Sequence, residues 1–234
     1  MNNLKLKNYN NGHRQRIIKK LKQNGFEQFE DYEIVELMLF LIFKRKDTKP
    51  IAKILLEKFK TIDNILNATD EELMQINGIG KSTCNSFKII NSIIKSVLKS
   101  KIINKNVITC FNDVINYIKL NMQNLNSEEV RLLLLNSKNI IIDDILIQKG
   151  SIDYVEIYPQ EILKHCISRG AKSIILIHNH PSGDPTPSTN DIYIANKIQD
   201  ATSVFNITVF DHIIIGGDQY ISFRNLNLLN NTNN

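Results

Sequence analysis

The chain has 234 residues, of which 42% are hydrophobic and 23% are charged, and it carries a net charge of +5. This length suits two small domains, and the composition is that of a globular protein rather than a disordered or membrane-spanning one, because every apolar stretch is too short to cross a bilayer. The polar, basic start of the sequence contains no apolar leader segment, so a cytoplasmic protein is expected.

The first part of the chain is predicted to be helical and basic. Residues 1–105 carry 20 basic and 11 acidic side chains, a net charge of +9, whereas residues 106–234 carry 9 and 13, a net charge of −4. This asymmetry favours two units with different partners, the first facing a polyanion. Apolar residues at helical spacing, a proline at a first-turn position and a capping box at Thr69 predict helices over 16–24, 31–43, 50–59, a short stretch from 70, and 82–99.

A glycine-bearing turn, Ile76-Asn77-Gly78-Ile79-Gly80-Lys81, joins the last two of these helices. Its glycines allow a tight bend, so that amides at the start of the next helix can meet a phosphate oxygen, and Lys81 and Lys88 add charge. The basic clusters at 14–22 and 44–49 favour DNA as a partner, whereas the acidic run at 70–72 opposes it. A plain helix–helix corner explains the same turn equally well, so both interpretations stay open.

A polar connection at residues 99–107 separates this helical domain, residues 1–104, from an α/β domain at residues 105–229; residues 230–234 are expected to form a disordered tail. The fold class is therefore α + α/β, and the two helices joined by the glycine-bearing turn, a helix-hairpin-helix arrangement, span about 69–99. Alternation, capping and turn residues predict helices over 111–122, 159–169 and 189–201, and strands over 130–135, 140–148, 173–178, 207–215 and 220–223.

The strongest functional signal is His178-Asn179-His180-Pro181, followed by Ser188 and Asp191. Side chains two apart on a strand share a face, so His178 and His180 can bind one ion at the strand's C-terminal end. A proline-rich loop can then return the chain so that Asp191, in the first turn of the next helix, supplies a carboxylate. Two imidazoles and one carboxylate leave a fourth position open for water, as in a catalytic zinc site.

Two simpler explanations compete with this metal site. Ser188 and Asp191 fit a capping box without any metal, although capping and metal binding are compatible. The two histidines alone also suit core residues that are hydrogen-bonded to the backbone. The three cysteines, Cys84, Cys110 and Cys166, are too scattered for a thiolate zinc site, so nitrogen and oxygen ligands are expected and the thiols are expected to be free and buried.

The spacing His178-x-His180-Pro181, six residues, Ser188-x-x-Asp191 resembles the JAMM (also called MPN or JAB) metalloprotease motif. The string His-Asn-His-Pro-Ser-Gly-Asp-Pro-Thr-Pro-Ser at 178–188 is similar to the RadC family in particular, as are Tyr-Pro-Gln-Glu at 158–161 and Asp-His-Ile-Ile-Ile-Gly at 211–216. RadC proteins also carry a helix-hairpin-helix region like that at 76–88. The resemblance therefore covers nearly the whole chain and implies a JAMM/MPN domain with a mixed sheet and flanking helices.

The resemblance also implies roles for individual residues. His178, His180 and Asp191 would bind one Zn²⁺ per chain, and Ser188 would donate a hydrogen bond to the oxyanion. A glutamate at the start of the first strand would move the proton of the activated water; the family places it eight residues before an Asn or Asp, here Asn136, which selects Glu128. Glu129 is the competitor and is expected to be solvated, since only one of the two can face the site. Glu156 and Glu161 are further carboxylates near the site in sequence, although such residues more often cap a helix or lie on its surface.

The expected function is zinc-dependent hydrolysis of a peptide or isopeptide bond by metal-activated water. The alternative is a DNA-binding accessory factor in DNA repair or recombination, whose zinc domain is structural or acts on nucleic acid. DNA would be bound through residues 76–88 and the basic N-terminal clusters. No membrane partner is expected.

Overall fold

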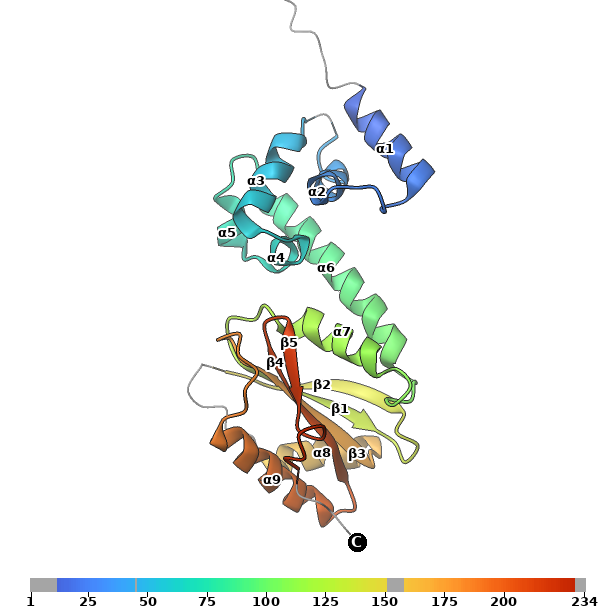
Figure 1. Cartoon of the computed structure of the whole chain (residues 1–234), viewed down its shortest axis with the longest axis vertical. Helices are drawn as coiled ribbons and strands as arrows, with labels where there is room; N and C mark the ends of the chain where they lie inside the picture. The colour runs from blue at the N-terminus through green and yellow to red at the C-terminus, as the bar shows by residue number, and fades with distance from the viewer. Residues whose placement is uncertain (1–11, 45, 151–157, 230–234) are drawn as a thin grey trace, which may run out of the picture. The chain divides into compact units, whose positions relative to one another are not determined.

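The computed structural model describes residues 12–44, 46–150 and 158–229 (Figure 1). The chain divides into two compact units, residues 1–93 and residues 94–234. The predicted tail at 230–234 and the carboxylate of Glu156 lie outside the described residues. None of the described helices combines the length and the apolar character that crossing a membrane requires.

The first unit consists of helices packed around one core. They are α1 (His13–Asn24), α2 (Asp31–Phe40), α3 (Lys49–Phe59), α4 (Ile62–Asn67), α5 (Asp70–Met74) and the first half of α6 (Lys81–Ile102). Val35, Leu39, Leu55 and Ile65 are fully buried in this core. The capping box predicted at Thr69 is confirmed, because its hydroxyl accepts from the Glu72 amide and Glu72 reaches back to the Thr69 amide.

Two elements of this unit differ from the prediction. The helix expected over 31–43 ends at Phe40, whose carbonyl accepts from the guanidinium of Arg14; the same guanidinium also donates to the carbonyls of Phe43 and Lys44, beyond the helix. The short helix α4 was not predicted. It begins at a Thr61 cap whose hydroxyl accepts from the Asn64 amide at 3.1 Å.

Helix α6 runs further than predicted and belongs to both units. It continues to Ile102, into the stretch expected to be a polar connection, and the division between the units falls at Ile93/Ile94 within it. Ile102 is fully buried in the core of the second unit. The domain boundary after residue 104 stays a prediction.

The second unit is a five-stranded mixed sheet in the order β2-β1-β3-β4-β5. Strand β1 is antiparallel to β2 and β3, β3 is parallel to β4, and β4 is antiparallel to β5. The predicted strands are confirmed to within a few residues, and three helices of the described residues pack on the sheet. The bounds are α7 (Phe111–Met122), β1 (Glu129–Leu135), β2 (Ile141–Lys149), α8 (Pro159–Arg169), β3 (Ser173–Asn179), α9 (Thr189–Ser203), β4 (Thr208–Gly216) and β5 (Gln219–Ser222).

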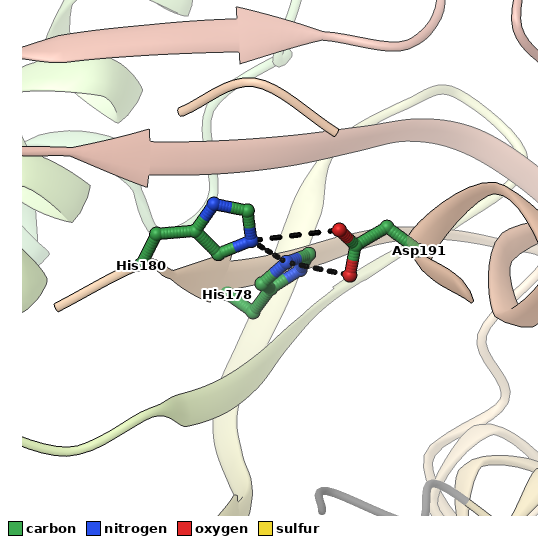
Figure 2. Close-up of side chains that lie close together, drawn as sticks. All are labelled: His178, His180 and Asp191. Atoms are coloured by element: carbon green, nitrogen blue, oxygen red, sulfur yellow. Dashed lines mark hydrogen bonds and ion pairs between the residues drawn. The ribbon is translucent and has the colours of Figure 1, made fainter. Parts of the chain in front are cut away.

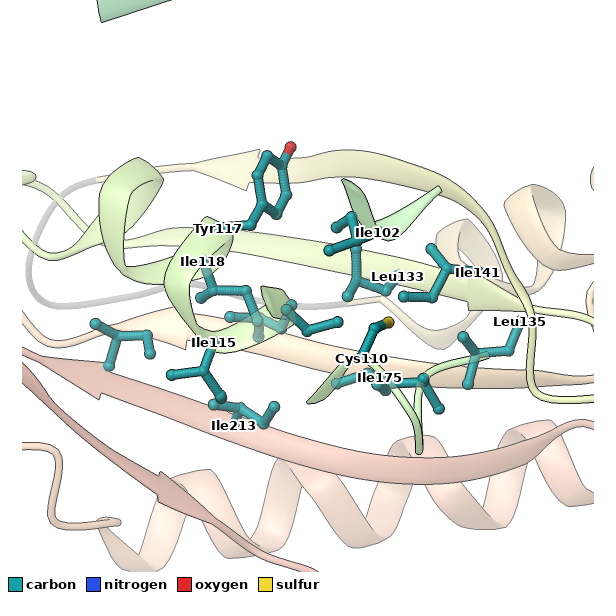
Figure 3. Packing of buried hydrophobic residues seen from close by; sticks show 14 of the residues in the cluster. Ile102, Cys110, Ile115, Tyr117, Ile118, Leu133, Leu135, Ile141, Ile175 and Ile213 are labelled. Carbon is teal, nitrogen blue, oxygen red and sulfur yellow. The ribbon is translucent and has the colours of Figure 1, made fainter. Parts of the chain in front are cut away.

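Alternating side chains send the sheet's apolar residues to two cores. Helix α7 covers one face, where Ile115 and Ile118 pack on Leu133, Ile175 and Ile213 (Figure 3). Helices α8 and α9 cover the other face (Figure 1), on which lie the side chains of the intervening strand residues, such as Leu132, Ile174 and Leu176. Every residue of β3 is buried, as befits a central strand covered on both faces. The α + α/β fold class is confirmed.

Candidate metal centre

The two histidines lie at the C-terminal end of β3, on the face covered by α8 and α9. His178 alternates with Ile174 and Leu176 of that face and is 6% exposed. His180 follows the last residue of the strand, and its amide donates to the Ile215 carbonyl at 2.8 Å, which extends the pairing with β4 by one step. The backbone therefore holds both side chains on one face, as the period of a strand requires.

Asp191 is brought to the histidines by a loop and a helix cap. The loop turns at Gly183, whose φ is +86°, and the side chain of Pro185 is buried. Ser188 is the N-cap of α9: its hydroxyl accepts from the Asp191 amide, and the Asp191 carboxylate accepts from the Ser188 amide at 2.7 Å. The predicted capping box is confirmed, and it fixes the direction in which Asp191 points.

The three side chains converge on one point (Figure 2). The Nε2 atoms of His178 and His180 are 3.0 Å apart, and the Asp191 oxygens lie 3.2 Å from the first and 3.5 Å from the second. One ligand atom from each residue lies within 4.8 Å of the others. A tetrahedral zinc with bonds of about 2.0–2.1 Å holds its ligands roughly 3.3 Å apart, so this donor set fits such an ion.

Hydrogen bonds orient the candidate ligands and shape the electrostatics around them. The Nδ1 atom of His180 donates to the Asp184 carbonyl at 2.8 Å, which leaves Nε2 as the nitrogen that can offer a lone pair to a metal ion. Burial alone would raise the pKa of Asp191, but hydrogen bonds from His178, His180 and Ser188 outweigh it and hold that pKa well below its usual range. The hydrogen bond to Asp191 raises the pKa of His180. The carboxylate is therefore ionised, as a metal ligand must be.

The two candidate glutamates lie at the start of β1 and face different ways. Val130 pairs with His178 in the antiparallel register of β1 and β3, and Glu128 lies one residue before β1, where continued alternation gives it the same face as the candidate ligands. The charge of Glu128 also contributes to the raised pKa of His180. Glu129 points to the other face and is buried against Lys149 at 3.0 Å. The expectation that Glu129 is solvated was wrong, because its cross-strand partner on β2 covers it.

The remaining carboxylate expected near the site, Glu161, is exposed in the first turn of α8, where a negative charge suits the helix dipole. Ser188 is exposed as well, and its hydroxyl donates to the Asp191 carboxylate at 2.6 Å.

The family model for the RadC-like JAB domain matches residues 108–228, more than half of the chain, and a helix-hairpin-helix model matches residues 49–89. The chain belongs to the RadC family. Its JAB-type domain is the mixed sheet with α7, α8 and α9, and its helix-hairpin-helix region lies in the first unit.

Two site residues of this RadC-family chain were not assigned a role from the sequence. Asn179, between the two histidines, is 2% exposed; its side chain accepts from the Glu129 amide at 2.8 Å and donates to the Ser127 carbonyl at 3.1 Å. It thus holds the backbone on both sides of Glu128. An amide side chain between the two histidines was the available signal.

The second unassigned residue is His212 on β4, whose Nε2 lies 2.8 Å from Nδ1 of His178. Burial lowers its pKa well below the usual value, and the neighbouring His178 lowers it further. The sequence offered only the resemblance of Asp-His-Ile-Ile-Ile-Gly to the family.

Proposed function

We propose that the JAB domain of this protein is a zinc-dependent hydrolase of peptide or isopeptide bonds. The observation that carries the proposal is the convergence of His178 Nε2, His180 Nε2 and the Asp191 carboxylate, within 4.8 Å of one another, beside a glutamate on the same face of the sheet. Three protein ligands leave one position of a tetrahedral zinc for a reacting molecule, whereas a structural zinc is normally closed by four.

Bound zinc would supply Lewis acidity, polarising the scissile carbonyl and making water nucleophilic near neutral pH. Glu128 then accepts the proton of the attacking water and delivers it to the leaving amine. Asn179 keeps that glutamate at its place by holding the backbone of Ser127 and Glu129. His180 and Asp191 stay fixed through the Asp184 carbonyl and the Ser188 cap.

Ser188 is the candidate donor to the developing oxyanion. Its hydroxyl has one proton, which it gives to Asp191 at 2.6 Å, so donation to an oxyanion requires rotation of the hydroxyl away from that carboxylate. The Ser188 amide keeps its own bond to Asp191 at 2.7 Å after such a rotation. A well-aimed oxyanion donor contributes on the order of 3 kcal/mol to the transition state.

The first test is metal content. Purified protein should contain about one zinc per chain. The double variant His178→Ala/His180→Ala should contain none, whereas His165→Ala on α8, which removes a histidine outside the centre, should keep it. Equal zinc in the double variant and the wild type would overturn the proposed site.

The second test concerns the reaction. Cleavage of a peptide and isopeptide library, followed by mass spectrometry, should stop on addition of a chelator and resume with zinc. Glu128→Gln should keep the zinc but slow cleavage by about 10²–10⁴, the usual contribution of a general base. Glu129→Gln loses only the ion pair with Lys149 and should cleave at nearly the wild-type rate. Faster cleavage by Glu128→Gln than by Glu129→Gln would contradict the assignment of Glu128.

DNA binding by the first unit is a second candidate function, favoured by the helix-hairpin-helix match at 49–89. The hairpin turns at Gly78, whose φ is +94°, and delivers the chain to the start of α6 at Lys81. Amides of a first helical turn have no intrahelical acceptor and can bind phosphate. Lys46 lies 3.5 Å from the Gly78 carbonyl and adds a cation there. Lys88 forms an ion pair with Asp70 at 2.6 Å, so its charge should contribute less to the binding of phosphate.

Fluorescence anisotropy with linear and branched DNA at about 50 and 200 mM salt tests this candidate. Lys46→Glu and Lys81→Glu should each weaken binding to all sequences and reduce the salt slope by about 1. Lys101→Glu, near the other end of α6, is the matched control and should change little. Absence of binding at the lower salt concentration would eliminate the candidate.

A further inference from the structure

We propose that His212 is a positioning residue of the metal centre, which accepts a hydrogen bond from Nδ1 of His178 and so fixes the ring whose Nε2 binds zinc. This inference rests on the proposed zinc site and adds to it a residue beyond the three ligands. It does not depend on which bond the protein hydrolyses.

The first support is the contact itself. Nε2 of His212 lies 2.8 Å from Nδ1 of His178, while Nε2 of His178 faces the other two ligands. The His212 ring is 1% exposed and packs against the fully buried ring of Phe223, with centroids 4.3 Å apart. Its position is therefore set by packing on one side and by the ligand on the other.

An irregularity in β4 puts His212 on the ligand face. Ile174 pairs with Val209, but Ile175 pairs with Asp211, so Phe210 is an extra residue in β4. Without this bulge, strict alternation from Val209 would turn His212 to the opposite face. With it, His212 shares the face of Val209 and Ile214, beside His178. Bulges often occur where a side chain must be re-aimed at a site.

Metal binding by His178 determines which of the two rings donates the hydrogen bond between His178 and His212. When Nε2 of His178 binds a cation it must offer its lone pair, so its proton sits on Nδ1 and is donated to Nε2 of His212. His212 then carries its own proton on Nδ1. That atom is buried and has no hydrogen-bond partner among the residues that the structure describes.

An unpaired buried N–H is costly in a purely structural residue, since an apolar side chain would fill the same space without the penalty. In His180, by contrast, the Nδ1–H group is not left unpaired, because it donates to a backbone carbonyl. The cost of the unpaired Nδ1–H of His212 is explained if Nε2 of the same ring is needed to accept from His178 and so to orient it.

Two substitutions separate this role from packing. In His212→Gln the amide oxygen stands the same number of bonds from the backbone as Nε2 and can accept from His178. In His212→Leu no acceptor remains. Ile213→Ala, at the next position of β4 but in the opposite core, is the control for lost packing alone.

The measurement is the Zn²⁺ dissociation constant of the full-length proteins, by competition with a chromogenic chelator. Loss of a ligand's outer hydrogen-bond partner typically weakens metal binding about 10–100-fold, which is the loss expected for His212→Leu. His212→Gln should stay close to the wild type, and so should Ile213→Ala despite its lower stability. Equal affinities of wild type and His212→Leu would overturn the inference, as would equal losses in both His212 variants.

A measurement on the wild type covers the case in which His212→Leu does not fold. Long-range ¹H–¹⁵N spectra of the zinc-loaded protein should show His178 and His212 both protonated at Nδ1. A proton on Nε2 of His212 would overturn the inference while leaving the zinc site intact. Wild-type protein that binds no zinc would overturn the inference and the proposed function together.

Discussion

Asn179 lies between two ligands of the proposed centre and cannot be one itself, because alternation turns it to the other side of β3. Its two hydrogen bonds, to the Glu129 amide at 2.8 Å and the Ser127 carbonyl at 3.1 Å, hold the segment before β1 against the end of β3. The Asn179 side chain is nearly fully buried, so these bonds compete little with water. One short side chain thus couples the position of the candidate base to the strand that carries the two candidate histidine ligands.

Asn179→Ala should therefore destabilise the second unit while leaving its zinc in place. It leaves the Glu129 amide and the Ser127 carbonyl without this partner, at about 1–3 kcal/mol for each group that stays unsatisfied. Urea unfolding followed by circular dichroism measures the loss, and the Glu129 amide should exchange faster with deuterium. Asn116→Ala, at an exposed position on α7, should change stability by less than about 0.5 kcal/mol. An unchanged rate of deuterium exchange at the Glu129 amide in Asn179→Ala would contradict this role of Asn179.

The buried thiol of Cys166 should make the stability of the protein depend on pH. Burial raises the pKa of Cys166 from 9.0 to about 11, so the folded protein favours the neutral thiol. Above pH 9 the unfolded chain releases this proton before the folded one does, and stability falls as pH rises toward 11. One pKa unit corresponds to 1.36 kcal/mol, so wild type should lose about 1 kcal/mol more than Cys166→Ala between pH 8 and pH 10.

Urea unfolding of both proteins at the two pH values measures this difference, and groups shared by the two proteins cancel. A loss of the same size in Cys166→Ala would show that another group is responsible. The same burial predicts slow reaction of Cys166 with a thiol reagent under native conditions.

At the scale of elements, the end of β4 and the proline loop are in close contact. A Cβ on Gly216 would lie 2.3 Å from the backbone nitrogen of Pro185 and 2.6 Å from the carbonyl carbon of Asp184. Since neither backbone atom can yield as a flexible side chain would, the loop must shift. The Asp184 carbonyl is the acceptor for Nδ1 of His180. Gly216→Ala should therefore weaken zinc binding, by an amount approaching the 10–100-fold of a lost outer contact, without changing a ligand.

Gly217→Ala is the matched control for this effect. Gly217 has a φ of +55°, so alanine there is strained, but its Cβ would meet only the Gly183 carbonyl at an ordinary 3.7 Å. This variant should lose stability and keep its zinc affinity. If both variants bound zinc as tightly as the wild type, the loop would not control the position of His180.

These contacts explain which features the sequence could predict. The histidine pair and Asp191 were predictable because strand alternation, a stiff loop and a helix cap each act within a few residues. The role of His212 depends on the bulge at Phe210, which no residue type marks, and the burial of Glu129 depends on the register of β2. Local rules therefore predicted the proposed ligands, while the residues that orient them required the pairing of distant strands.

At the scale of the whole molecule, the boundary between the units lies in a continuous helix. Leu98 and Ile102, on the last turns of α6, pack in the core formed by α7 and the sheet, and the Asn104 amide donates to the Ile141 carbonyl at 2.8 Å. A boundary after residue 104, as predicted from composition, removes these contacts from the JAB domain. A boundary at residue 94 keeps them.

The fragments 94–229 and 105–229 test the two boundaries. Loss of a buried isoleucine typically costs about 2–5 kcal/mol, so the shorter fragment should be less stable than the longer one by at least that amount. The variant Ile102→Ala of the longer fragment should account for most of the difference, because it removes the same side chain without shortening the helix. Thermal and urea unfolding measure both effects, and zinc content reports whether the centre still assembles. Equal stability of the two fragments would place the boundary after residue 104, since the end of α6 would then add nothing to the JAB domain beyond a connection.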